Sequence, residues 1–233
     1  MKALIYGING KMGRVLTEEI LKEKNITLLG GVSSSKAFNK DILVQSDLKN
    51  FEIPDVIIDF SHYSNLRRIL NYAISNNVAL VLATTGYSDA DFKLIEDASK
   101  IVPIIYSSNY AIGIHTINKS IKYYLFYLKN FDIEIIEKHH KNKIDKPSGT
   151  ALKFLKEINK YRFIDVPVHS LRSGNIVGEH TIIFTSDDEE IEITHKITSK
   201  RVFAIGAIKA AKFIVKQKPK LFDMDDLFGS DEV

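Results

Sequence analysis

The stretch Ala3-Leu4-Ile5-Tyr6-Gly7-Ile8-Asn9-Gly10-Lys11-Met12-Gly13 runs from an apolar segment through three glycines into a helical pattern. This order predicts a buried strand, a tight turn and the start of a helix. Glycines here let the backbone turn sharply and let a phosphate approach the free N–H groups of the helix start. We therefore predict a dinucleotide-binding turn. The expected cofactor contacts are Gly7, Ile8, Asn9, Gly10, Lys11, Met12 and Gly13.

The glycine spacing leaves a second interpretation open. It is Gly-x-x-Gly-x-x-Gly, whereas the commoner dinucleotide pattern is Gly-x-Gly-x-x-Gly. A close strand-to-helix turn without any ligand could use the same residues. The position directly after a strand and before a helix favours dinucleotide binding.

Outward from this turn, the first half of the chain alternates short apolar runs with helical patterns. The predicted strands cover residues 3–6, 26–32, 56–59, 78–82 and 101–106, and the predicted helices cover residues 12–24, 65–76 and 89–100. Such alternation is typical of a parallel sheet with right-handed crossovers. We therefore predict an α/β fold whose N-terminal part is a Rossmann-like, doubly wound parallel sheet.

The character of the chain changes after residue 110. The predicted elements are a long helix over 113–128, strands over 133–137, 166–171, 180–185 and 190–197, and a helix that begins at residue 151. The last three strands alternate apolar and polar residues, which is typical of a mixed or antiparallel sheet with one solvated face. A final helix over 202–215 is expected to pack on the first domain. The predicted domains are residues 1–110 plus 201–233, and a central α+β domain of residues 111–200.

Composition excludes several classes of function. The 32 Lys and Arg residues against 29 Asp and Glu residues give a formal net charge of +3. This charge is too small and too evenly spread to indicate nucleic-acid binding, but it suits an acidic small molecule as a ligand. The absence of cysteine excludes disulfides and thiolate metal sites. Without a signal-peptide layout or an apolar run of membrane-spanning length, we expect a cytoplasmic protein with no membrane contact.

The segment after the second predicted strand bears on the choice of cofactor. NAD-binding domains commonly place an Asp or Glu there for the adenosine ribose, but this chain has Val32-Ser33-Ser34-Ser35-Lys36. Hydroxyl groups and a lysine, with Lys11 nearby, suit a 2′-phosphate. We therefore predict NADPH in preference to NADH, bound in part by Ser34 and Lys36. The alternative is that these are only polar loop residues.

Three further loops follow the ends of predicted parallel strands, where doubly wound sheets bind ligands. The first contains Asp59-Phe60-Ser61. Cofactor contacts are expected in the second from Ala83, Thr84 and Thr85, and in the third from Ser107, Asn109 and Tyr110. Taken alone, these residues could also be helix caps or ordinary packing residues at a domain boundary.

The densest group of reactive side chains is Glu137-Lys138-His139-His140-Lys141-Asn142-Lys143-Ile144-Asp145-Lys146-Pro147-Ser148-Gly149-Thr150-Ala151. Histidine titrates near neutral pH, lysine can hold a carboxylate, and the Ser-Gly-Thr triplet presents free backbone N–H groups before a helix. The pattern indicates chemistry on a small anionic substrate. A metal site is disfavoured, because adjacent strand residues point to opposite faces and lysines are not usual ligands. The alternative is a solvated basic loop with two surface histidines.

The order His-His-x-x-Lys-x-Asp-x-Pro-Ser-Gly-Thr-Ala resembles the signature of the 4-hydroxy-tetrahydrodipicolinate reductases, or dihydrodipicolinate reductases. The glycine turn and residues 107–113, 167–174, 178–180 and 201–207 resemble further motifs of this family, in the same order along the chain. Two positions depart from the family pattern. Ala83 replaces its usual glycine, and Tyr110 replaces its phenylalanine.

The resemblance implies a homotetrameric enzyme that reduces 4-hydroxy-tetrahydrodipicolinate to tetrahydrodipicolinate in the diaminopimelate route of lysine biosynthesis. NADPH or NADH would supply the hydride, the first domain would bind it, and the central domain would bind the dicarboxylate substrate and form the oligomer contact. The resemblance implies His139 as the proton donor and Lys143 as the second catalytic residue. The implied substrate-binding residues are His140, Ser148, Gly149 and Thr150.

Two arginines in the matching motifs, Arg172 and Arg201, are expected to form salt bridges between domains or subunits rather than to act in catalysis. Two other functions remain compatible with the sequence. One is a different NADPH-dependent reductase of a small dicarboxylate, and the other is a non-catalytic NADPH-binding regulator whose His-His segment binds an effector.

Overall fold

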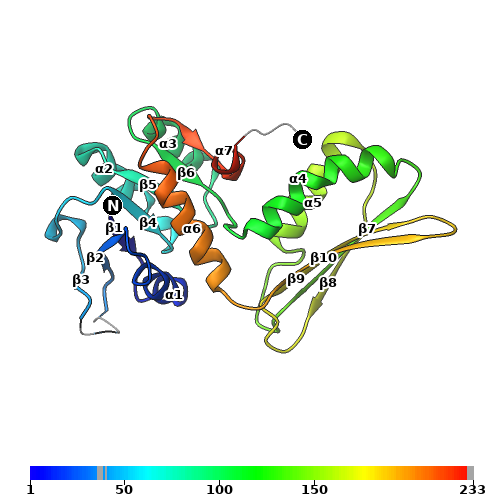
Figure 1. The fold of residues 1–233 in the computed structure, drawn as a ribbon, viewed down its shortest axis with the longest axis horizontal. Coiled ribbons are helices and arrows are strands. Elements are labelled where there is room, and N and C mark those ends of the chain that lie inside the picture. Colours follow the sequence, from blue (N-terminus) through cyan, green and yellow to red (C-terminus); the bar gives the residue numbers. More distant parts are fainter. Residues whose placement is uncertain (36–38, 40, 230–233) are drawn as a thin grey trace. The chain divides into compact units, whose positions relative to one another are not determined.

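The chain folds into two compact units. A computed structural model describes residues 1–35, 39 and 41–229 (Figure 1). Unit 1 comprises Met1–Tyr110 and Arg201–Val233, and unit 2 comprises Ala111–Lys200.

Unit 1 is built on a seven-stranded sheet in the order β11-β6-β5-β4-β1-β2-β3. The strands are β1 (Lys2–Tyr6), β2 (Thr27–Val32), β3 (Val44–Gln45), β4 (Val56–Asp59), β5 (Ala79–Leu82), β6 (Ile104–Tyr106) and β11 (Leu221–Phe222). Every neighbouring pair is parallel. The chain order reverses at β1, which has β2 on one side and β4 on the other, so the predicted doubly wound parallel sheet is confirmed. The short edge strands β3 and β11 were not predicted.

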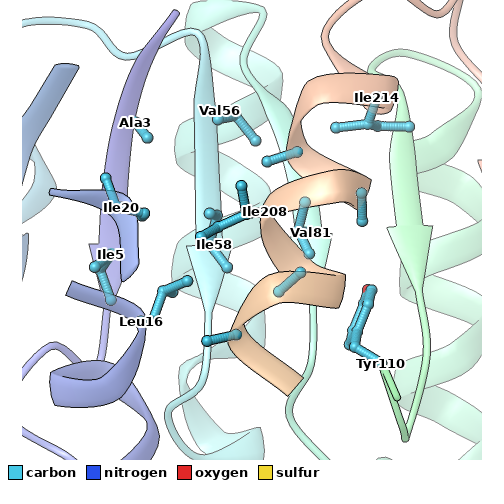
Figure 2. Close-up of a cluster of buried hydrophobic side chains, with 14 of the residues drawn as sticks. Ala3, Ile5, Leu16, Ile20, Val56, Ile58, Val81, Tyr110, Ile208 and Ile214 are labelled. Atoms are coloured by element: carbon cyan, nitrogen blue, oxygen red, sulfur yellow. The ribbon is translucent and has the colours of Figure 1, made fainter. Parts of the chain in front are cut away.

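The helices of unit 1 bury apolar residues against this sheet. They are α1 (Lys11–Ile20), α2 (Leu66–Asn76), α3 (Asp89–Ser99), α6 (Arg201–Ile214) and α7 (Met224–Phe228), with short 3₁₀ helices at Leu48–Asn50 and Tyr63–Asn65. In Figure 2, α6 lies across the central strands, and Ile208 packs among Ile58 and Val81. Gly206 permits this approach, because a Cβ there would lie 1.9 Å from the backbone oxygen of Tyr110. The core of unit 1 therefore joins sequence segments from both ends of the chain.

Unit 2 is a mixed four-stranded sheet with the order β10-β9-β7-β8. Its strands are β7 (Asp132–His139), β8 (Val168–Arg172), β9 (Gly178–Thr185) and β10 (Glu190–Ile197), and its helices are α4 (Ile112–Tyr127) and α5 (Gly149–Tyr161). The β7–β8 pair is parallel, whereas β7–β9 and β9–β10 are antiparallel. The predicted mixed sheet is thus confirmed.

One face of β7 determines where the polar residues of unit 2 go. Side chains alternate along a strand, and the buried positions are Ile133, Ile135, Glu137 and His139. Strand β7 extends two residues beyond its predicted end. The carboxylate of Glu137 and the imidazole of His139 are therefore buried on the same face of β7 as the two isoleucines.

Candidate active site

Glu137 is the centre of a buried polar cluster in unit 2. Its side chain has no solvent exposure, and Arg172 holds both carboxylate oxygens, with Nη1 2.8 Å from Oε2 and Nη2 2.6 Å from Oε1. Parallel pairing of β7 and β8 places Arg172 opposite His139, which brings its side chain to this carboxylate. A bidentate pair of this kind fixes the plane as well as the charge of the carboxylate.

His139 lies on the same face of β7, two residues further on. Its Nδ1 is 2.5 Å from Oε2 of Glu137. The other ring nitrogen, Nε2, faces Gly178, where an added Cβ would approach it to 3.2 Å. Among the described residues no hydrogen bond to Nε2 is formed, so this nitrogen is left for a ligand.

Burial and neighbouring charges shift the pKa of both Glu137 and His139. Burial alone would raise the pKa of Glu137, but hydrogen bonds from Arg172, Ser170 and His139 outweigh it and lower the pKa to about 2. Burial lowers the pKa of His139 below its ordinary value, while the hydrogen bond and charge of Glu137 oppose this and Lys143 and Arg172 add to it. The carboxylate is therefore ionised at neutral pH, and the imidazole can lose a proton there.

Ser148 connects the cluster to the start of α5. Its backbone N–H donates to Oε1 of Glu137 at 3.2 Å, and its hydroxyl accepts the N–H of Ala151 and lies 2.9 Å from Nε2 of His180. The prediction of a free backbone N–H at Ser148 is therefore wrong, because the carboxylate of Glu137, at a sequence separation of 11, accepts it. Burial, together with the nearby His139, lowers the pKa of His180 to about 3, so His180 is neutral.

The loop after β7 carries the predicted substrate-binding residues. Lys143 pairs with Asp145 at 2.8 Å, and the backbone oxygen of Asp145 accepts a hydrogen bond from Arg172 at 2.5 Å. His140 is half-buried just beyond the strand. Gly149 is exposed at the start of α5, and no atom of the described residues lies within 4 Å of where a Cβ would stand. Thr150 follows it, half-buried. The structure thus brings Lys143 and His139 into one polar neighbourhood of unit 2.

The predicted dinucleotide turn of unit 1 has the geometry that a phosphate requires. Gly7 has a φ of +86°, and a Cβ on Gly13 would lie 2.2 Å from the Gly7 oxygen. Helix α1 begins after Gly10 with no side-chain cap and no acidic residue in its first turn. A helix start of this kind offers unsatisfied N–H groups and a positive dipole end, so the residues fit a pyrophosphate.

Asn9 ties this turn to the segment after β2. Its side-chain amide donates to the hydroxyls of Ser33 at 3.1 Å and Ser35 at 2.8 Å. Ser34 lies between them and is exposed, so its hydroxyl can meet a ligand. Lys36, the second predicted contact to a 2′-phosphate, lies outside the described residues.

The loops after β4 and β5 are joined through a second buried carboxylate, Asp59. It accepts from the Ser61 hydroxyl at 2.5 Å, the Ser61 N–H at 3.0 Å, the Thr84 hydroxyl at 2.7 Å and the Tyr87 hydroxyl at 3.3 Å. Burial raises the pKa of Asp59, and these neutral donors oppose the shift. The Thr84 hydroxyl is therefore used internally, whereas Ala83 is half-buried and Thr85 is exposed at the same sheet edge.

The loop after β6 is stabilised by hydrogen bonds of its own residues. Ser107 donates to the backbone oxygen of Asn109 at 2.8 Å, which stabilises the turn. Tyr110 is 1% exposed, and its hydroxyl donates to the backbone oxygens of Leu82 and Ile105. Its ring belongs to the core of unit 1 (Figure 2), and the cofactor contacts of this loop stay predictions.

The two motif arginines each form an ion pair within one unit. Arg172 pairs with Glu137 inside unit 2, and Arg201 pairs with Glu19 inside unit 1 at 2.8 Å. Salt bridges between subunits stay a prediction for these residues. Sequence reasoning gave no role to Glu137 or His180. The alternation Ile133, Ile135, Glu137 was the available signal, because it places the carboxylate on the buried face.

One unit has a doubly wound sheet with an uncapped glycine turn, and the other buries an imidazole and a carboxylate. These features are those of a two-domain, dinucleotide-dependent oxidoreductase. Residues 1–110 match the family described as dihydrodipicolinate reductase, N-terminus, and residues 113–228 match dihydrodipicolinate reductase, C-terminus. The chain belongs to the dihydrodipicolinate reductase family, which confirms the family expected from the motifs.

Individual relatives agree with this assignment. The chain is 42% identical to the 4-hydroxy-tetrahydrodipicolinate reductase of Brachyspira hyodysenteriae, over 98% of this chain and 100% of that protein. It is 39% identical to the enzyme of the same name from Caldanaerobacter subterraneus subsp. tengcongensis, over 97% and 98%. The structure of dipicolinate-bound dihydrodipicolinate reductase from Paenisporosarcina sp. TG-14 has a TM-score of 0.81 at 21% identity, covers 96% of this chain and 97% of that one, and supports the fold. Within the described ranges, none of the helices is long and apolar enough to cross a membrane.

Proposed function

We propose that this chain reduces 4-hydroxy-tetrahydrodipicolinate to tetrahydrodipicolinate in the diaminopimelate route of lysine biosynthesis. The curated relatives that match it along nearly its whole length carry this activity in their names. The observation that carries the mechanism is the buried His139, whose Nδ1 is held by Glu137 while Nε2 is left for a ligand.

The overall reaction consumes one reduced nicotinamide and one proton. The substrate loses its 4-hydroxyl group as water, and the resulting carbon–carbon double bond gains a hydride at one carbon and a proton at the other. The reduced nicotinamide supplies the hydride when it is bound. His139 supplies the proton from Nε2 as the hydride arrives, and the imidazole is protonated again from solvent.

Charge on the substrate carboxylates is met by the loop after β7. Lys143 gives up or shares its contact with Asp145 to bind one carboxylate, and His140, Gly149 and Thr150 complete the binding residues. Ser148 is also proposed as a substrate-binding residue, and its side chain and N–H fix the start of α5. Positioning of this kind lowers the entropic part of the barrier.

Cofactor binding is proposed for the glycine turn and the adjoining loops of unit 1. The open N-terminus of α1, Gly10, Lys11 and the backbone of the turn would hold the pyrophosphate. The loops around Ala83, Thr85 and Ser107 would adjoin the nicotinamide, since they follow the carboxyl ends of β5 and β6.

The test is oxidation of NADPH, followed by its ultraviolet absorbance, with substrate generated enzymatically. Substrate-dependent turnover is expected, and its absence would favour an NADPH-binding regulator. His139→Gln should lower kcat by about 10²-fold or more while leaving NADPH affinity unchanged. Lys143→Ala should chiefly lower kcat/KM. An unimpaired His139→Gln enzyme would remove this residue from the acid role.

NADPH is proposed as the preferred cofactor, because the segment after β2 offers hydroxyls and no carboxylate. Comparison of kcat/KM for NADPH and NADH tests this preference, and a higher value for NADH would refute it. Ser34→Asp should shift the ratio toward NADH, because a carboxylate there repels a 2′-phosphate and can bind a ribose hydroxyl. The homotetramer and the cytoplasmic location stay predictions. Light scattering of the purified protein tests the first.

A further inference from the structure

We propose that Glu137, clamped by Arg172, is the positioning residue that fixes the tautomer of His139 and makes Nε2 the nitrogen from which a proton leaves. The inference rests on the proposed function for its catalytic meaning. Its structural part, the tautomer of His139, stands on the contacts of Glu137 alone.

The contacts of Glu137 allow one arrangement of protons. Oε1 accepts from Arg172 and from the Ser148 N–H, and Oε2 accepts from Arg172 and adjoins Nδ1 of His139 at 2.5 Å. An ionised carboxylate has no hydrogen to donate. Nδ1 must therefore carry the hydrogen of this contact, and in the neutral ring Nε2 is the bare nitrogen. When the ring is protonated, the hydrogen that can leave is on Nε2.

Arg172 is what keeps this arrangement from reversing. A fully buried carboxyl group without a charged partner would take up a proton and could then donate to the imidazole. The guanidinium cannot lose its own proton at any relevant pH, and the Ser148 amide cannot either. The Ser170 hydroxyl, which also hydrogen-bonds to Glu137, stays protonated at these pH values. Among the described partners of Glu137, His139 is thus the one that exchanges a proton, and it does so at the atom turned away from Glu137.

Arg172 also joins the acid to the substrate loop. Besides Glu137 it donates to the backbone oxygen of Asp145 at 2.5 Å, and the Asp145 side chain holds Lys143 at 2.8 Å. The guanidinium of Arg172 therefore positions the imidazole of His139 through Glu137. It also positions the loop that carries Lys143, through Asp145. Arg172, on β8, thus supplies the counter-charge for Glu137, which follows Ile133 and Ile135 on the buried face of β7.

Burial and three charged groups set the proton affinity of the His139 ring. Burial disfavours the protonated form, Glu137 favours it, and Lys143 and Arg172 disfavour it. His180 lies with its ring centroid 5.1 Å away and is neutral. Removing the Glu137 charge leaves two cations and a neutral ring. The imidazole would then hold its proton less well, and activity would fall at a lower pH than in the native enzyme.

The decisive variant is Glu137→Gln, with Glu134→Gln as its matched control. Glu134 is on the same strand and pairs with His169 at 3.0 Å, but this pair is exposed and does not contact His139. In Glu137→Gln we expect kcat to fall about 100-fold, with little change in KM or NADPH affinity, and the alkaline limb of kcat to move to lower pH. Glu137→Asp, which restores the charge, should recover part of the pH profile. Glu134→Gln should match the native enzyme.

A measurement independent of turnover completes the test. Nitrogen-15 NMR of the imidazole rings reports the tautomer, and the His139 signals are assigned by their loss in His139→Gln. The native protein should show hydrogen on Nδ1, and Glu137→Gln should show a mixture of tautomers. If Glu137→Gln is poorly folded, Glu137→Gln combined with Arg172→Gln removes both charges and is measured instead. An unchanged tautomer and pH profile would overturn the proposal. A native protein with the expected tautomer but no turnover would overturn only the proposed function.

Discussion

Among the residues that the structure describes, each unit buries one carboxylate completely, and the two have opposite kinds of hydrogen-bond partners. Asp59 in unit 1 accepts hydrogen bonds from hydroxyls and one backbone N–H, all neutral. Glu137 in unit 2 faces the guanidinium of Arg172 and the imidazole of His139. The pKa of Asp59 is raised by burial, whereas that of Glu137 is lowered to about 2. Burial therefore does not decide the charge of a carboxyl group, and its partners do.

The difference matches what each site has to do. Asp59 joins the loops after β4 and β5 at the sheet edge, because Ser61 and Thr84 both donate hydrogen bonds to it. This role requires oxygen atoms that accept hydrogen bonds, but it does not require that the carboxyl group be charged. Glu137 must stay ionised so that the neighbouring imidazole of His139 keeps its hydrogen on Nδ1. Substitution of each carboxylate, and a change of pH, should therefore affect the stability of the two units differently.

The largest expected effect on stability comes from Glu137→Gln. It leaves the buried guanidinium of Arg172 without its counter-charge, and breaking a buried pair on one side costs about 3–5 kcal/mol. Urea denaturation, followed by NMR signals of β7 and β9, measures the unfolding free energy of unit 2. Combining Glu137→Gln with Arg172→Met should recover much of the loss. A single variant within about 1 kcal/mol of the native protein would contradict the importance of this pair.

Lowering the pH should destabilise unit 2 before it destabilises unit 1. The folded pKa of Glu137, about 2, lies below its ordinary 4.5, so its stabilisation is present above pH 4.5 and is lost as the pH falls toward 2. His180, with a pKa of about 3 against 6.5, likewise loses stabilisation as the pH falls between these values. Asp59 acts in the opposite sense, because its stabilisation is present at low pH and is lost as the pH rises through its raised folded pKa.

Unit 2 should therefore lose its NMR signals at a higher pH than unit 1 during an acid titration. Signals of β7 and β9 report on unit 2, and those of β1 and β4 report on unit 1. If the NMR signals of β1 and β4 are lost at a higher pH than those of β7 and β9, the predicted opposite pH dependence of the two carboxylates is wrong.

The same contrast explains what could be predicted from the sequence. The parallel sheet followed from local apolar runs alternating with helices, and the position of His139 followed from a motif. Glu137 could have been found, because the alternation from Ile133 and Ile135 places it on the buried face. Its partnership with Arg172 could not, because that depends on the pairing of β7 with β8 across an intervening helix.

Hydrogen bonds formed in the fold limit what a motif says about individual atoms. Ser148 was expected to offer a free N–H, but Glu137, at a sequence separation of 11, accepts it. Tyr110 was expected to contact the cofactor, and its hydroxyl donates to Leu82, at a separation of 28. A motif identifies residue types near a site, but which atoms remain available depends on tertiary hydrogen bonds.

A smaller effect is expected for Asp59→Asn. Oδ1 of the new amide can still accept from Ser61, and its NH₂ group can donate to the hydroxyls of Thr84 and Tyr87, which rotate to accept. No charge is left unpaired, so the unfolding free energy of unit 1 should change by less than about 1 kcal/mol at neutral pH. The same denaturation experiment, followed through β1 and β4, measures it. A loss as large as that of Glu137→Gln would mean that the charge of Asp59 is required.

The smallest effect is expected for Glu134→Gln, which removes a carboxylate paired with His169 on the same strand as Glu137. Both side chains are about half exposed, at 52% and 51%, so water replaces the lost contact and salt already screens it. The change in unfolding free energy should be below about 0.5 kcal/mol. Both substitutions remove a carboxylate that contacts histidine, and they differ in burial and in the presence of an arginine. If Glu134→Gln destabilises unit 2 as much as Glu137→Gln does, then β7 is sensitive to any substitution, and the loss at Glu137 cannot be assigned to its buried pair.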